Sequence, residues 1–240
     1  MSVAAVRRAV IVNADDFGQS DGTTDGIIRA HEHGVVTSTS LMVRWPAAGR
    51  AAAYARERPQ LSVGLHLDLA EWKRVGFGWE PIYEVAPLDD PEAVRAEVQR
   101  QFDLFRSLVG REPTHVDSHQ HVHTRDEVRD AVLTAARAIA APVRHFDPRV
   151  RYNGGFYGQS AEGELMLQHI HPGALVALIR DLPDGISEIG CHPAAVDDLD
   201  TMYAHERLVE LATLCDPAVR AAFIDYGVAL VSFADVVSAL

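Results

Sequence analysis

Short apolar runs alternate with longer amphipathic segments along almost the whole chain. The first run, residues 9–12, is Ala-Val-Ile-Val, a β-branched pattern typical of a buried strand. The segment after it, residues 23–34, places apolar residues at helical spacing and ends on glycine, which predicts a helix. Further strands are predicted at residues 35–43, 61–69, 115–123, 143–146, 187–191 and 228–232. Further helices are predicted at residues 47–59, 91–110, 126–140, 173–182, 206–214 and 233–240.

Two stretches show neither the apolar pattern of a strand nor that of a helix. Residues 70–90 contain glycines, prolines and two tryptophans, and residues 150–163 are rich in glycine and tyrosine. An irregular stretch as long as the first is usually a functional loop when it occurs inside a compact domain. We therefore predict that both stretches are loops, the first with a functional role.

The order of the elements predicts the fold class. Repeated β-then-α units indicate an α/β protein with a parallel sheet and helices outside it. About seven such units in 240 residues favour a (β/α) barrel over an open sheet. No linker, composition break or strong internal repeat interrupts the pattern, so a single domain over residues 1–240 is expected. Active sites of such barrels form at the carboxyl ends of the strands.

Composition excludes several classes of function. The formal net charge of −12 and the isoelectric point near 5.4 argue against nucleic acid or an anionic membrane as a partner, because both require a basic surface. The two cysteines lie far apart and lack the spacing of metal ligands. No apolar run approaches the roughly 18 residues that span a bilayer, and the first residues do not resemble a secretory signal. These features predict a soluble cytoplasmic protein.

The densest concentration of polar chemistry is "HVDSHQHVH", residues 115–123. His115, Asp117, His119, His121 and His123 occupy alternate positions, which would face one side of an extended strand. Side chains two residues apart are separated by about 6.6 Å along a strand, whereas ligand distances to an ion are near 2 Å. One ion can therefore take only one or two ligands from this segment.

Two adjacent carboxylates follow the first predicted strand. Asp15 and Asp16 in "VNADDFG" repel each other unless a cation is close. A divalent ion would hold one of them as a ligand and leave the other as a base. His66 in "GLHLDL" falls near the end of the third predicted strand, beside these groups. A polar turn and a core histidine are the alternative explanations.

Other polar and aromatic residues fall in turns and loops. His192 precedes Pro193, which makes its backbone extended or turning, and it could act as an acid or base or contact a substrate. Aromatic side chains in loops suit stacking on sugar rings, although packing in the core is an equal explanation. These aromatic residues are Trp72, Trp79, Tyr152, Phe156 and Tyr157.

Five segments occur in the order and spacing of one known family. "VNADDFG", "HEHGVVTSTSLMV", "VGLHLDL", "PTHVDSHQHVH" and "EIGCHPA" resemble the motifs of the YdjC-like carbohydrate deacetylases, which include the chitooligosaccharide deacetylases. The resemblance covers nearly the whole chain. It implies a distorted, TIM-like (β/α) barrel, one divalent metal ion and removal of the acetyl group from an N-acetylated sugar. Residues 70–91 look short beside the chitooligosaccharide members, which leaves the identity of the sugar open.

The motifs carry roles over to particular residues. The resemblance implies Asp16, His66 and His119 as metal ligands and Asp15 as the catalytic carboxylate, while family membership favours Mg²⁺ and imidazole ligands favour Zn²⁺. Asp15 would take a proton from water, and His192 would protonate the leaving amine. His192 would need a carboxylate partner, for which Asp68, Asp117 and Glu188 are the candidates. The expected substrate-binding residues are Trp72, His121, His123, Phe156 and Tyr157.

Two alternatives remain at this point. One is a non-catalytic protein that binds a sugar or a metal. The other is a non-haem iron enzyme, which also uses two histidines and one carboxylate, although its usual scaffold is all-β. The expected partner is a small carbohydrate, and a homodimer is possible.

Overall fold

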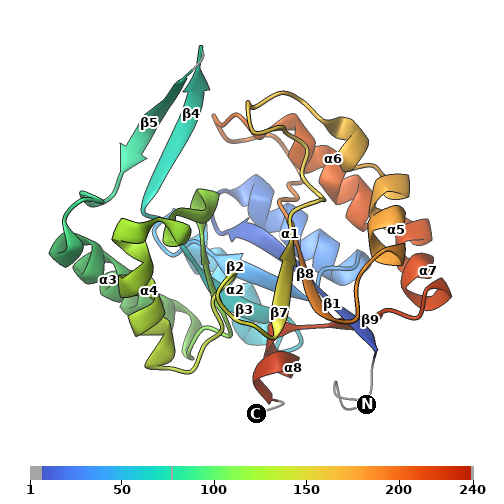
Figure 1. Cartoon of the computed structure of the whole chain (residues 1–240), viewed down its shortest axis with the longest axis horizontal. Coiled ribbons are helices and arrows are strands. Elements are labelled where there is room, and N and C mark those ends of the chain that lie inside the picture. The colour runs from blue at the N-terminus through green and yellow to red at the C-terminus, as the bar shows by residue number, and fades with distance from the viewer. Residues whose placement is uncertain (1–6, 77, 239–240) are drawn as a thin grey trace.

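Strand β1 (Arg8–Phe17) lies at the centre of a curled parallel sheet, and its neighbours come from distant parts of the chain (Figure 1). In the computed structural model the strand order is β6-β3-β2-β1-β8-β7, and β9 also pairs with β1. One edge of β1 pairs with β8, while the other pairs with β9 over its first half and with β2 over its second half. This arrangement brings the carboxyl ends of β1, β3, β6 and β8 to one end of the sheet.

The structure describes residues 7–76 and 78–238, so residues 1–6, 77 and 239–240 of the predicted 1–240 domain lie outside the described residues. The other strands of the sheet are β2 (Ser38–Leu41), β3 (Ser62–Leu67), β6 (Val116–Ser118), β7 (Val150–Asn153), β8 (Gly185–Cys191) and β9 (Ala229–Val231). A separate hairpin consists of β4 (Ala70–Val75) and β5 (Gly78–Glu84). The helices are α1 (Asp21–His33), α2 (Ala48–Glu57), α3 (Pro91–Val109), α4 (Asp126–Arg137), α5 (Pro172–Arg180), α6 (His205–Leu214), α7 (Pro217–Asp225) and α8 (Phe233–Ser238).

The predicted α/β class and the distorted barrel of about seven parallel strands are confirmed. All pairings within the seven-stranded sheet are parallel, and helices surround it (Figure 1). The barrel is not closed, because β6 and β7 form the two ends of the sheet and Val143 adds only a single bridge to Val116. Every residue of β2 and β3 is buried, and so is β1 after Arg8, as is usual for parallel strands that are covered on both faces.

Three local predictions were wrong. Residues 70–90 are not an irregular loop, because most of them form the β4–β5 hairpin, which projects away from the sheet (Figure 1). Nearly all of β5 is exposed, so it has no buried face that would leave a hydrophobic period in the sequence. Residues 143–146 form turns rather than a strand, and the predicted loop at 150–163 begins with β7. Helix α7 was not predicted.

The histidine-rich segment also departs from its prediction. Only Val116–Ser118 is a strand, and residues 119–124 form a tight 3₁₀ turn. Gln120 and His121 have φ angles of +47° and +54°, which is left-handed backbone. The change of backbone ends the alternation after Ser118, so the five residues do not share one face.

None of the helices within residues 7–76 and 78–238 is long and apolar enough to cross a bilayer.

Gly64 of β3 lies against the ring of His115, and a β-carbon at this position would come within 2.5 Å of that ring. We expect Gly64→Ala to lower the free energy of unfolding by roughly 1–3 kcal/mol, the usual cost of overpacking a core. The control is Gly49→Ala in α2, where a β-carbon meets nothing within 4 Å. That change should be neutral or stabilise by up to about 1 kcal/mol. Urea denaturation of both variants tests this, and equal effects would contradict it.

Candidate active site

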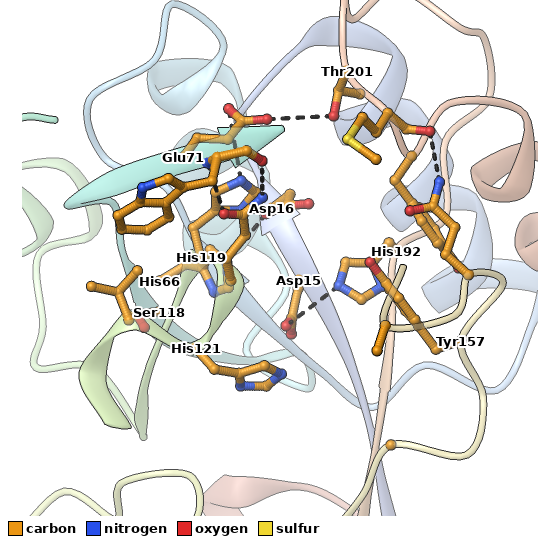
Figure 2. A pocket seen from close by; sticks show the side chains of 18 of the residues that line it. Asp15, Asp16, His66, Glu71, Ser118, His119, His121, Tyr157, His192 and Thr201 are labelled. Atoms are coloured by element: carbon orange, nitrogen blue, oxygen red, sulfur yellow. Dashed lines mark hydrogen bonds and ion pairs between the residues drawn. The ribbon is translucent and has the colours of Figure 1, made fainter. Parts of the chain in front are cut away.

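The carboxyl ends of the strands open into a cavity of about 710 Å³. Residues of the hairpin line one side of it, and Tyr157, His192 and the segment 201–203 line the other (Figure 2). Between them lie acidic and histidine side chains from β1, β3 and the turn after β6. This is the end of the barrel at which the sequence predicted a site.

Asp15 and Asp16 both line this cavity although they are adjacent on β1. Neighbouring residues of a regular strand point to opposite faces. The pairing of β1 with β2 is irregular between Ala14 and Phe17, and Asp16 has a φ of +67°. The irregular backbone therefore breaks the alternation and lets one short motif supply two carboxylates to the same site.

Asp16 lies between His66 and His119, and these three residues form the histidine cluster. Its Oδ1 is 3.2 Å from His66 Nε2 and 3.0 Å from His119 Nδ1, and its Oδ2 accepts a hydrogen bond from Arg207 Nη2 at 2.7 Å. Burial raises the pKa of Asp16, but the charges of Arg207 and His119 outweigh this and hold it well below the usual value. Asp16 is therefore ionised at neutral pH.

The two histidines are surrounded by negative charge. Burial lowers the pKa of His66, but Asp117 reverses the effect and raises it to about 10, and His66 Nδ1 donates to Asp117 Oδ1 at 2.8 Å. Burial likewise lowers the pKa of His119, and Asp16 raises it to about 9. One ligand atom from each of Asp16, His66 and His119 lies within 4.8 Å of the others. A buried carboxylate with two imidazoles is a donor set that suits a divalent ion.

Asp15 is held by a different cation. Arg144 donates to both of its carboxylate oxygens, with Nη1 at 2.6 Å and Nη2 at 2.8 Å, and Asn13 Nδ2 donates to Oδ1 at 2.8 Å. Burial raises the pKa of Asp15, but Arg144 outweighs it, so the pKa is lowered. Asp15 is thus ionised and fixed in orientation without joining the Asp16 cluster.

Arg144 takes the place of a cation in a second group of potential metal ligands. Asp15, His66 and Asp117 lie close enough to hold an ion, but Arg144 Nη2 is 2.8 Å from Asp117. The guanidinium already supplies the positive charge at this place. Glu188 shares the same arginine at 2.6 Å, yet burial outweighs that contact and raises the pKa of Glu188 to about 7.

His192 lies across the cavity from the histidine cluster (Figure 2). Its Nε2 is 3.8 Å from Asp15 Oδ2, and its Nδ1 is 3.9 Å from Glu210 Oε1. Its backbone N–H donates to Glu210 Oε2 at 2.5 Å, and Tyr203 donates to the other oxygen. Burial lowers the pKa of His192 to about 4 and raises that of Glu210 to about 8.

The predicted carboxylate partners of His192 were therefore wrong. Asp68 accepts from Arg44 and Tyr83, and Asp117 and Glu188 contact Arg144. Glu210 is the carboxylate nearest to His192 Nδ1 among these acids, and it belongs to α6, which the sequence reading did not connect with the site.

Residues 9–225 match the family model described as YdjC-like protein. The chain belongs to the YdjC-like family. It is 35% identical over 260 residues to the chitooligosaccharide deacetylase of Serratia marcescens, and 34% identical over 261 residues to that of Citrobacter koseri. In both comparisons the alignment covers 96% of this chain and 100% of the relative.

Solved structures share the fold. A crystal structure of an Enterococcus faecalis protein is 25% identical with a TM-score of 0.73, covering 96% of this chain and 99% of that one. A family 4 carbohydrate esterase from Streptomyces lividans has a TM-score of 0.51 at 13% identity, covering 94% and 93% of the two chains. The second likeness shows that the barrel of the YdjC-like family is also found in proteins of distant sequence.

The histidine-rich motif of this YdjC-like chain distributes its side chains over three environments. His119 and His121 line the cavity, and His121 lies within hydrogen-bond distance of His145. His115 is buried and stacks on Phe233 at 3.8 Å. His123, expected to bind substrate, is also buried, because its two ring nitrogens contact Ser118 Oγ and the Arg144 carbonyl. His123 does not line the cavity, so that prediction is corrected.

Aromatic residues of the YdjC-like chain also divide between cavity and core. Trp72 and Tyr157 line the cavity as expected. Phe156 does not, because it is only 1% exposed and packs in the hydrophobic core, which excludes it from stacking on a substrate. Tyr203 also lines the cavity and stacks on Tyr157 at 4.6 Å, a role that the sequence did not reveal.

Three charged residues near the site were missed by sequence reasoning. Arg144 follows a short apolar run that resembled a weak strand, and Arg207 and Glu210 lie in a segment predicted only as an amphipathic helix. In α6, Glu206, Arg207 and Glu210 are all buried. These three charged residues on the inner side of α6 are a signal that could have identified Arg207 and Glu210, whereas nothing similar marks Arg144.

The raised pKa of Glu188 has a consequence for stability. Its ordinary value is 4.5 and its folded value about 7, so the folded chain binds this proton more tightly than the unfolded chain. The stability that this proton contributes is complete below pH 4.5 and is lost as the pH rises through 7. Glutamine does not titrate, so Glu188→Gln should not lose this stability. Between pH 5 and pH 8.5 its free energy of unfolding should therefore rise by roughly 1–3 kcal/mol relative to that of wild type.

Urea denaturation at several pH values measures this difference. The control is Glu84→Gln on the exposed hairpin, which should keep a constant offset from wild type. Parallel pH profiles of Glu188→Gln and wild type would contradict the expectation.

Proposed function

We propose that this chain is a metal-dependent hydrolase that removes the acetyl group of an N-acetylated, chitooligosaccharide-like sugar, giving an amine and acetate. The observation that carries the proposal is the convergence of Asp16, His66 and His119 beside a separate, ionised Asp15. The names of the relatives from Serratia marcescens and Citrobacter koseri support the substrate class. A purely binding protein would have no need of a second carboxylate held apart from the ligand cluster.

The residues present fit a divalent ion. Asp16, His66 and His119 would hold it, because one carboxylate oxygen and two imidazole nitrogens, all buried, lie within 4.8 Å of one another. A bound divalent ion supplies Lewis-acid polarisation of a carbonyl and activation of water. The two imidazoles favour Zn²⁺, and membership of the family favours Mg²⁺.

Asp15 is the proposed general base. Arg144 and Asn13 fix both of its oxygens, which keeps the carboxylate charged and aimed at the cavity. Arg144 makes Asp15 a weaker base, but a base that is always ionised can accept the proton of the attacking water at neutral pH.

His192 is the proposed acid for the leaving amine. The lowered pKa means that its ring is neutral in the resting site, so it does not store a proton beforehand. It lies 3.8 Å from Asp15, which places it to receive the proton that Asp15 removes from water. Glu210 accepts the backbone N–H of His192 and so holds this residue in place while its ring passes the proton to the amine nitrogen.

The sugar would be held by the cavity walls. Trp72 and Tyr157 offer aromatic faces from opposite sides, and His121 offers a polar edge between them. Pyranose rings present apolar faces and hydroxyl edges, and this combination of groups is suited to both. The proposed partner is accordingly a small carbohydrate.

Release of acetate from N,N′-diacetylchitobiose tests the proposal. Wild type loaded with Zn²⁺ or Mg²⁺ should release acetate, and removal of the metal with a chelator should stop it. We expect Asp15→Asn to lose roughly 10²–10⁴ in turnover, the usual worth of a general base, while retaining metal. Asp16→Asn should lose the metal itself. The control, Asp197→Asn at an exposed position, should match wild type. Loss of metal in Asp15→Asn and retention in Asp16→Asn would show that the two roles are reversed.

The role of His192 predicts a selective defect. His192→Ala should reduce turnover of the same substrate by roughly 10²–10⁴, because the amine would leave without a proton. Zn²⁺ affinity, measured by calorimetry, should not change, since His192 lies outside the ligand cluster. Wild-type turnover in His192→Ala would refute the assignment.

A further inference from the structure

The β4–β5 hairpin brings one more buried carboxylate to the site. Glu71 is the second residue of β4 and is only 6% exposed, although most of the hairpin faces solvent. Its Oε1 accepts a hydrogen bond from Thr201 Oγ1 at 3.4 Å, and its Oε2 lies 3.8 Å from His119 Nε2 (Figure 2). A carboxylate in this position requires a partner, because burial disfavours an unpaired charge.

His119 presents the complementary unpaired group. Its Nδ1 lies 3.0 Å from Asp16 Oδ1, while its Nε2 is buried without a hydrogen-bond partner in the described part of the chain. His66 shows the same arrangement in complete form: Nε2 lies 3.2 Å from the same Asp16 oxygen, and Nδ1 donates to Asp117 at 2.8 Å. The two histidines differ in one respect: Asp117 is within hydrogen-bond distance of His66, whereas Glu71 is 3.8 Å from His119.

We propose that Glu71 is the positioning residue of His119, as Asp117 is of His66. The inference rests on the proposed metal function of Asp16, His66 and His119. When an ion is bound, Glu71 would accept the Nε2–H of His119 and so fix the tautomer that leaves the Nδ1 lone pair free for that ion. Histidines that bind metals almost always donate their second nitrogen to such a partner, and the partner also increases the basicity of the ligand.

The backbone around Glu71 is held against the turn that carries His119. Gln120 accepts from the Trp72 backbone N–H and donates to the Trp72 carbonyl, both at 2.9 Å. The hairpin register is irregular between Glu71 and Trp72, as occurs at a β-bulge that redirects a side chain. Tyr83, opposite Glu71 in the hairpin, donates to Asp68 at 2.7 Å and so anchors the end of the hairpin that is nearest to the sheet.

This assignment links the wall of the cavity to the metal site. The hairpin that carries Glu71 also presents Trp72 and Trp79 to the cavity.

Titration of the metal-free chain with Zn²⁺ tests the proposal by calorimetry. Glu71→Gln and Glu71→Ala should bind Zn²⁺ about 10–100-fold more weakly than wild type, the usual effect of losing such a partner. The matched control is Glu80→Gln, which removes the same charge from an exposed position of the same hairpin and should bind as wild type does. In the Zn²⁺-loaded chain, the downfield proton resonance of His119 Nε2–H should persist in Glu80→Gln and disappear in Glu71→Ala.

The outcomes separate this inference from the function on which it rests. Wild-type Zn²⁺ affinity in both Glu71 variants, with an unchanged His119 resonance, would overturn it. Complete loss of binding, as expected for Asp16→Asn, would also overturn it, because Glu71 would then be a direct ligand. Failure of the wild-type chain to bind Zn²⁺ would instead overturn the metal site itself. A circular dichroism spectrum matching wild type establishes that the variants are folded.

Discussion

The guanidinium of Arg144 is the group on which the arrangement of the site depends. It is fully buried and lies within 2.6–2.8 Å of Asp15, Asp117 and Glu188, which come from three different strands. One positive charge cannot balance three buried acids, and the pKa values divide accordingly: those of Asp15 and Asp117 are lowered, and that of Glu188 is raised to about 7. Without this cation, β1, β6 and β8 would bring uncompensated negative charges together in the interior.

From Arg144 the contacts continue in a line across the end of the barrel. Asp117 contacts Arg144 on one side and accepts from His66 on the other, His66 contacts Asp16, and Asp16 ends the line at Arg207. The two arginines thus flank two acids, Asp117 and Asp16, that are joined by His66. Each acid of the line is fixed by a group on both sides, which leaves the side chains little freedom to reorient.

The barrel and most of the residues that converge on the cavity could be predicted from the sequence because both depend on local patterns. The run Ala-Val-Ile-Val marks β1, and apolar residues at alternate positions mark β3. The candidate residues Asp15, Asp16, His66 and His192 lie at or next to the ends of strands. Features that depend on tertiary context were not visible. The left-handed backbone at Gln120 and His121 broke the predicted alternation. Arg144 and Glu210 reach the site from a turn and a helix whose sequences show only their local structure.

The central position of β1 also has a consequence for how the chain folds. One edge of β1 pairs with β8 from Arg8 to Ala14, and the contact of Cys191 Sγ with the Asn13 carbonyl spans 178 residues. Part of the other edge is completed by β9, later still in the chain. Closing such long loops costs entropy before any pairing is gained, so we expect these non-local contacts to slow folding. During synthesis, β1 can pair with β2 early, but its β8 and β9 partners are missing until residues 185–231 have been made. Until then its unpaired backbone N–H and C=O groups are open to incorrect partners.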